Sequence, residues 1–112
     1  MDKNNELINE FINASISYGE YQKQGNSRGM DKQSKIISKV VEDIKKHGLN
    51  ELRALSGYLE HKNIYVRLQV ALSIIPIEPN KAKKALNELR NEKSLVAVEA
   101  EMILEQLEKG ML

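Results

Sequence analysis

The sequence contains no cysteine and no tryptophan, and its aromatic residues are one phenylalanine, Phe11, and four tyrosines. Without thiols the chain cannot form a disulfide framework, a thiolate metal site or a cysteine nucleophile. Only two prolines and six glycines are present, and each stands singly in the sequence. The composition therefore excludes cysteine chemistry and is compatible with a reducing compartment.

Neither sign of charge is in clear excess, since the chain has 17 lysines and arginines and 16 aspartates and glutamates. A net charge of +1 gives no overall field toward a polyanion, so nucleic-acid binding is disfavoured. No window approaches the roughly 18 apolar residues of a membrane span. The start, "MDKNNELINEF", lacks the basic and apolar regions of a secretory signal, which predicts a cytosolic protein with no membrane association.

What is present is helical periodicity over 112 residues, a length that accommodates one domain, residues 1–112, with a single core. Strand signals of period two are missing, so the fold class is all-α. Six helices are predicted, separated by short turns, three of which contain Gly25, Gly48 and Pro76. They cover residues 4–23, 27–47, 49–59, 64–75, 79–89 and 95–109.

The predicted boundaries rest on local chemistry. Gly25 ends the first helix, and Asn26 or Ser27 caps the second. The second helix ends at Gly48 after a basic last turn. Asn63 and Ser94 cap the fourth and sixth helices, while Pro76 stops the fourth, Pro79 opens the fifth and Gly110 ends the sixth.

Short connections make consecutive helices antiparallel, so six helices give three hairpins. The second and third hairpins are weakly alike: Ala54-Leu55 corresponds to Ala85-Leu86, and Ala71 to Ala100. A helix in the middle of such a stack is covered on most sides and must be apolar all round. A central position in the stack accounts for the apolar segment "IYVRLQVALSII". Its aliphatic residues are predicted to be buried: Val66, Leu68, Val70, Leu72, Ile74 and Ile75.

Arg67 is the one cation in this segment. Its structural interpretation places the stem along a seam and the guanidinium on a carboxylate or carbonyl of a neighbouring turn. The alternative is an anion-binding site. An unpaired arginine in a seam would cost several kcal/mol, so a partner is expected in either case.

The stretch "ELRALSGYLEHKNIYVRLQVALSIIPIEPNKAKKALNEL" resembles a HEAT-type helical repeat, whose second helix opens with Val-Arg, here Val66-Arg67, and continues with small and aliphatic residues. The whole chain is similar to a group of small bacterial HEAT-like domains of unknown function. The resemblance implies a right-handed stack of three antiparallel helical hairpins, an alpha-alpha superhelix. It also implies a scaffold that grips other proteins, as immunity proteins bind a toxin. The sixth helix, "SLVAVEAEMIL", departs from the pattern because it has no Val-Arg pair.

No catalytic residue, cofactor-binding residue or metal ligand is predicted, and no cofactor is expected. His47 and His61 fall in turns without further ligands at metal spacing. "GNSRG" lacks the Lys-Ser/Thr of a phosphate loop. The protein is therefore expected not to be an enzyme.

The predicted function is non-catalytic binding of another protein, with an immunity or regulatory role, by a monomer or weak homodimer. The predicted contact residues lie on second helices of the hairpins: Lys35, Lys39, Glu42, Tyr65, Gln69, Ser73, Glu101 and Glu105. Tyr65 either lies exposed in this surface or covers the hairpin turn. One alternative function is nucleic-acid binding through the lysines of the second helix, with Lys23 and Arg28. Another is self-association through Leu95, Val96 and Val98.

Overall fold

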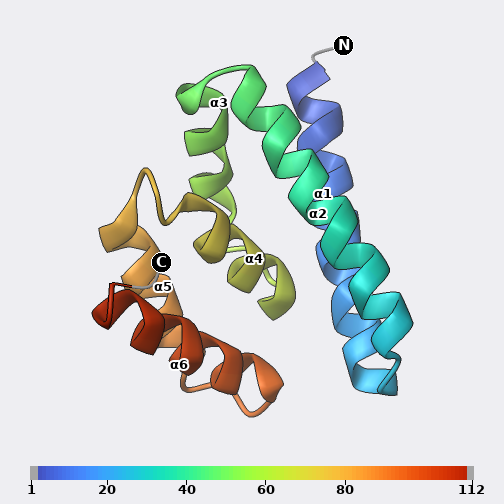
Figure 1. The fold of residues 1–112 in the computed structure, drawn as a ribbon, viewed down its shortest axis with the longest axis vertical. Coiled ribbons are helices and arrows are strands. Elements are labelled where there is room, and N and C mark those ends of the chain that lie inside the picture. The colour runs from blue at the N-terminus through green and yellow to red at the C-terminus, as the bar shows by residue number, and fades with distance from the viewer. Residues whose placement is uncertain (1–2, 111–112) are drawn as a thin grey trace. The chain divides into compact units, whose positions relative to one another are not determined.

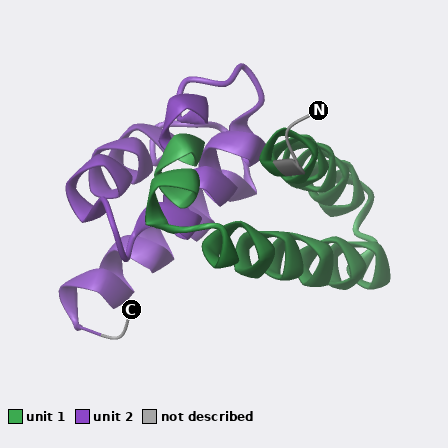
Figure 2. Cartoon of the chain, turned by 90° about the horizontal axis from the view of Figure 1, so that it is seen from above, with its two compact units in different colours: residues 1–55 green, residues 56–112 purple. Residues whose placement is uncertain are grey.

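The computed structural model describes residues 3–110, and the chain divides into two compact units, residues 1–55 and 56–112 (Figure 2). All regular structure in the described part is helical, which confirms the all-α fold class (Figure 1). A single domain spanning residues 1–112 stays a prediction, and its first two and last two residues lie outside the described part. The elements are α1 (Lys3–Gln24), α2 (Ser27–Lys46), α3 (Leu49–Arg53), the 3-10 helix η1 (Ala54–Tyr58), α4 (Ile64–Ile74), α5 (Pro79–Leu89) and α6 (Leu95–Glu108).

The first unit is built on the hairpin of α1 and α2. Gly25 takes a φ of 68°, a conformation that costs glycine little, and reverses the chain. Asn26 then caps α2, its Oδ1 accepting a hydrogen bond of 3.0 Å from the Gly29 amide. With two connecting residues the helices must run antiparallel, as the sequence predicted, and they lie along each other in Figure 1.

Burial in this hairpin follows the helical repeat. The buried side chains recur every three or four residues: Leu7, Ile8, Phe11, Ala14 and Ser15 on α1, and Ile37, Val40, Val41 and Ile44 on α2. Ser15 is fully buried, and its hydroxyl donates a 2.8 Å hydrogen bond to the Phe11 carbonyl. The buried hydroxyl is thereby satisfied within α1.

A glycine allows the closest approach of α1 and α2. A Cβ built on Gly29 would lie within 3.0 Å of three ring carbons of Tyr21. These atoms include Cγ, at the base of the ring, so a rotation of the ring about its own axis would not remove the clash. Only a hydrogen fits at this position of α2.

The third predicted helix differs from the structure. Residues 49–59 were expected to form one helix, but α3 ends at Arg53 and η1 continues as a tighter 3-10 turn to Tyr58. The Ser56-Gly57 pair weakens an α-helix at this point, because serine competes for backbone hydrogen bonds and glycine costs conformational entropy. Leu52 and Leu55 are nevertheless fully buried.

In the second unit α4, α5 and α6 all pack on one another. Their starts are those that the sequence predicted. Asn63 Oδ1 accepts from the amides of Tyr65 at 2.9 Å and Val66 at 3.2 Å. Pro79 occupies the first turn of α5, where a missing amide hydrogen costs nothing. Ser94 Oγ accepts from the Val96 amide at 3.1 Å.

Helix α4 is buried around most of its circumference, as its apolar sequence predicts, while its place in the middle of a stack of hairpins stays a prediction. Its buried residues are Tyr65, Val66, Leu68, Gln69, Val70, Ala71 and Ile74. The prediction was wrong for Leu72, which is 37% exposed, and Ile75 is only half-buried. A helix that is apolar on every side carries no signal of which residue stays uncovered, and here Leu72 is exposed although Leu68, one turn earlier on the same face, is buried.

Candidate protein-binding surface

The candidate site is the outer face of α6. Ser94 starts this helix, and Val96 and Ala100 are fully buried on its inner face. The α6 apolar stripe, by which we mean Leu95, Val98 and Met102, faces outward with exposures of 57%, 54% and 55%. Spacings of three and four residues place the three side chains in one row along the helix.

Carboxylates flank the α6 apolar stripe. Glu101 and Glu105 are exposed on one side of it, and the half-buried Glu99 lies on the other side. The helix holds four glutamates and no lysine or arginine. Large apolar side chains with a polar rim are the usual composition of a protein contact surface.

The sequence predicted part of this stripe. Leu95 and Val98 are exposed as expected for the self-association alternative, whereas the prediction was wrong for Val96, which is fully buried. Met102 was missed. Its signal is the spacing of seven residues from Leu95, which repeats the same helix face after two turns.

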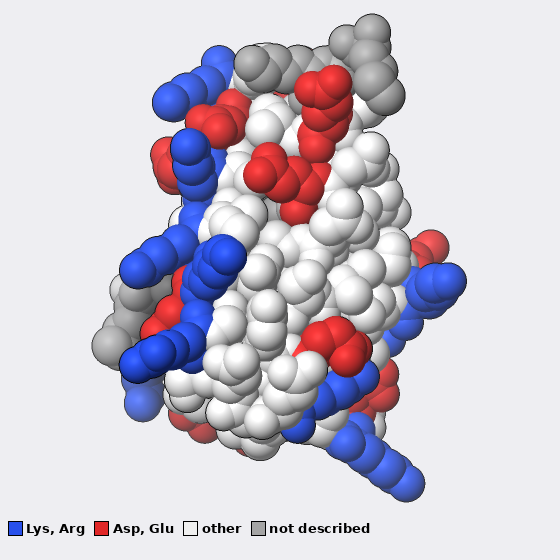
Figure 3. All heavy atoms as spheres, turned by 90° about the vertical axis from the view of Figure 1, so that its right-hand side faces the viewer, with Lys and Arg blue, Asp and Glu red and all other residues white. Residues whose placement is uncertain are grey.

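A second exposed surface lies on α2. Arg28, Lys32, Lys35 and Lys39 are exposed and recur at spacings of four, three and four residues. We call this set the α2 basic row. Figure 3 shows lysine and arginine side chains along one margin of the α1–α2 face and a broad uncharged area beside them. None of the four cations pairs with a carboxylate in the described residues, whereas neighbouring Lys45 pairs with Glu42 at 3.4 Å.

The other sequence-predicted contact residues fall into two groups. Lys35, Lys39 and Glu42 are exposed on one face of α2, and Glu101 and Glu105 are exposed on α6; their role in binding stays a prediction. On α4 the prediction of an exposed surface was wrong, because Tyr65 is 5% and Gln69 is 9% exposed.

Ser73 completes the α4 group and is half-buried. Its hydroxyl donates to the Gln69 carbonyl at 2.7 Å, a bond within α4. The α4 group therefore consists of two buried side chains and one half-buried side chain. They do not form a free face, and of the two interpretations of Tyr65 the exposed one is excluded.

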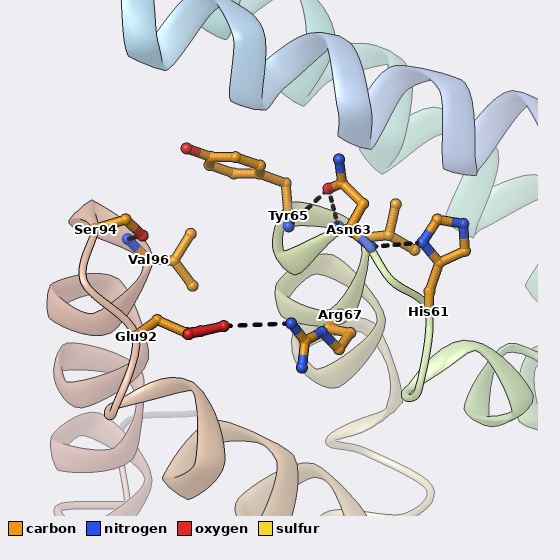
Figure 4. Close-up of polar contacts among 8 residues, drawn as sticks. His61, Asn63, Tyr65, Arg67, Glu92, Ser94 and Val96 are labelled. Atoms are coloured by element: carbon orange, nitrogen blue, oxygen red, sulfur yellow. Dashed lines mark hydrogen bonds and ion pairs between the residues drawn. The ribbon is translucent and has the colours of Figure 1, made fainter.

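Arg67 has the structural partner expected of it. Its Nη2 donates to Glu92 Oε1 at 3.3 Å, and Glu92 lies in the turn between α5 and α6 (Figure 4). The two side chains are 27% and 37% exposed. Arg67 Nε is buried without a hydrogen-bond partner, so the guanidinium is held by a single contact at its edge.

Both histidines contact the backbone close to their own positions in the chain. Near the end of α2, His47 Nδ1 lies 2.9 Å from the Asp43 carbonyl. His61 Nδ1 accepts from the Asn63 amide at 3.0 Å, just before α4 (Figure 4). Residues 3–110 contain no cluster of three histidine, aspartate or glutamate side chains placed to hold a metal ion. Among the described helices, none combines the length and apolar character needed to cross a bilayer.

Comparison with protein families places the chain. The model of a family described as a domain of unknown function, DUF2019, matches residues 5–108. The protein belongs to the DUF2019 family. This confirms the resemblance to a domain of unknown function, while the HEAT-like character stays a prediction. No curated protein gives a significant match.

The DUF2019 chain is also similar to a solved structure. The crystal structure of the protein RPA1889 from Rhodopseudomonas palustris CGA009 aligns with a TM-score of 0.90 and 21% sequence identity. The alignment covers 97% of this chain and 91% of that one. At this identity the similarity shows the fold of this DUF2019 protein and does not extend to its chemistry.

Proposed function

We propose that the protein is a non-catalytic binding module that holds a partner protein on the α6 apolar stripe. The observation that carries the proposal is the outward exposure of Leu95, Val98 and Met102, each more than half accessible, in one row. Keeping three large apolar side chains in water costs free energy that a partner would recover by covering them. The predicted role as an immunity or regulatory protein is one form of this function.

The glutamates beside the α6 apolar stripe indicate which kind of partner would fit it. Because Glu101 and Glu105 line one side of the stripe, a partner with an apolar ridge and lysine or arginine beside it complements the surface. An amphipathic helix with a basic flank has this composition and packs by the same three- and four-residue spacing. The apolar ridge would supply the affinity and the basic flank the orientation.

The experiment compares two charge insertions at matched exposure. Val98→Glu interrupts the stripe, while Leu49→Glu changes an equally exposed leucine, 59% accessible, on α3. A partner isolated from the native lysate and purified should bind the wild-type chain and Leu49→Glu alike, and Val98→Glu at least about tenfold more weakly, since a central apolar contact is replaced by a desolvated charge. Circular dichroism checks that each variant is folded.

The result against the proposal is equally concrete. Equal binding by all three chains would move the contact elsewhere. A dimer in light scattering that Val98→Glu dissociates, with no other partner bound, would replace the proposal with the self-association alternative.

The α2 basic row favours a second candidate function, contact with a polyanion such as nucleic acid. Four exposed cations without ion pairs extend over three turns, and phosphate contacts of this kind weaken as salt rises. Labelled RNA and DNA should then bind with an affinity that falls steeply between low and moderate salt. Lys35→Glu with Lys39→Glu should abolish binding, whereas Lys93→Glu, an exposed lysine in the α5–α6 turn, should retain it.

We also keep the HEAT-like superhelix as a proposal for the fold. The Val66-Arg67 pair at the start of α4 and the packing of α5 on α6 support it. An experimental structure in which the three predicted hairpins do not stack with a constant right-handed rotation would contradict it.

A further inference from the structure

A hollow of about 320 Å³ lies between α5 and α6. It is lined by Lys83 and Asn87 on α5, by Arg90 directly after α5, and by Leu104, Leu107 and Glu108 on α6. On α6 these residues lie on the side of the helix away from the α6 apolar stripe, because Leu104 is nine residues from Leu95, which amounts to two and a half turns. The hollow is therefore a separate surface from the candidate protein-binding site.

One wall of the hollow is cationic and held in place. Arg90 Nη1 donates to Asn87 Oδ1 at 3.1 Å, and Asn87 Nδ2 donates in turn to the Lys83 carbonyl at 3.0 Å. This chain of hydrogen bonds holds the Arg90 side chain back along α5. Arginine has five N–H donors, and this contact uses one, so the guanidinium keeps donors for a ligand.

The α6 side of the hollow combines two leucines with Glu108. Leu104 and Leu107 are half-buried and present part of their surface to the hollow. Neither Lys83 nor Arg90 forms an ion pair with a carboxylate in the described residues, including Glu108 at the rim. Two cations without ion pairs and two leucines therefore line the same hollow, together with Glu108.

We propose that this hollow binds a small monocarboxylate that carries an apolar chain. The carboxylate accepts hydrogen bonds from Arg90 and attracts the Lys83 ammonium, and the chain lies on Leu104 and Leu107. Arginine is suited to the first contact because its planar group matches a carboxylate. The volume lies at the lower end of the range for ligand pockets, which suits one short chain. Glu108 at the rim opposes a second negative charge on the ligand.

The test uses octanoate as the probe, octan-1-ol as the uncharged control and the full chain labelled with ¹⁵N. Octanoate should shift amide signals of residues 83–90 and 104–108, and octan-1-ol should bind more weakly. Arg90→Gln should weaken octanoate binding about five- to tenfold, because one charge-assisted contact is lost at a half-open site. Lys84→Gln removes an exposed lysine from α5 outside the hollow and should leave the affinity unchanged.

Glu108→Gln provides a gain-of-binding variant, since it removes the only carboxylate lining the hollow in the described residues. Octanoate should bind this variant more tightly than the wild-type chain. Three results would overturn the proposal: no shift at millimolar octanoate, equal binding of octanoate and octan-1-ol, or shifts that gather at Val98 and Met102 instead.

Discussion

Arg67 and Glu92 lie 25 residues apart in the chain and meet at 3.3 Å. The contact links the first turn of α4 to the turn between α5 and α6. It gives a carboxylate partner to the Arg67 guanidinium, whose Nε stays without a hydrogen bond. The sequence required such a partner but did not identify it, because five acidic residues from Glu78 to Glu101 lie in and around the following two helices.

The first prediction concerns the strength of this pair. A double-mutant cycle with Arg67→Met and Glu92→Gln should give a coupling of about 0.5–1 kcal/mol, since both side chains keep part of their contact with water. Urea unfolding measures it. The exposed pair of Lys23 and Glu20, at 62% and 58% exposure, is the matched control and should give a smaller coupling. Equal couplings would mean that the linkage between the two turns adds nothing.

The second prediction concerns the start of α4. Asn63→Ala removes the acceptor of two amide hydrogen bonds and should lower the free energy of unfolding by about 1–2 kcal/mol. Asn91→Ala changes an exposed asparagine in the α5–α6 turn and should change stability by less than about 0.5 kcal/mol. The role of the cap is refuted if the two variants unfold at the same denaturant concentration.

The third prediction reverses the usual effect of a helix substitution. Glycine to alanine within a helix commonly stabilises by about 0.5–1 kcal/mol. Gly29→Ala should instead destabilise by about 1–3 kcal/mol, because the new methyl group collides with the ring of Tyr21. Gly57→Ala, where the added carbon meets no atom within 4 Å, is the control. A Gly29→Ala protein as stable as the wild type would show that α1 and α2 are packed less closely.

The fourth prediction compares a covered and a partly exposed leucine on the same face of α4. Leu68 is 1% exposed and Leu72 is 37% exposed, one turn apart on the same helix. Leu68→Ala should cost about 2–5 kcal/mol and Leu72→Ala less than about 1.5 kcal/mol. Thermal and urea denaturation measure both. Similar losses would indicate that Leu72 is covered in solution, as the sequence had predicted.

The predictability of the fold differs between helix boundaries and helix faces. Asn26, Asn63, Pro79 and Ser94 act within one turn of their own position, so the sequence predicted where helices begin. The faces of α4 depend on contacts far along the chain, and an all-apolar helix gives no periodic signal to orient it. This is why the sequence left two positions open for Tyr65, whereas the buried face of the amphipathic α2 followed from its periodicity.

The candidate surface was predictable in part for the same reason. The outer side of α6 has two apolar residues near its start, Leu95 and Val98, and these were recognised. Val96 lies between them in sequence but points about 100° around the helix from Leu95, and it was assigned to the wrong face. The hollow beside Arg90 was not predictable, because Asn87 and Leu104 come together only when α5 packs on α6.

The turn before α4 has a consequence for the order of folding. Its hydrogen bonds, from Asn63 to His61 and from Tyr65 and Val66 to Asn63, each close a loop of only two or three residues. Such short closures lose little chain entropy and can precede contacts between distant segments. If this turn nucleates the second unit, Asn63→Ala will slow refolding and leave the unfolding rate nearly unchanged in a chevron experiment.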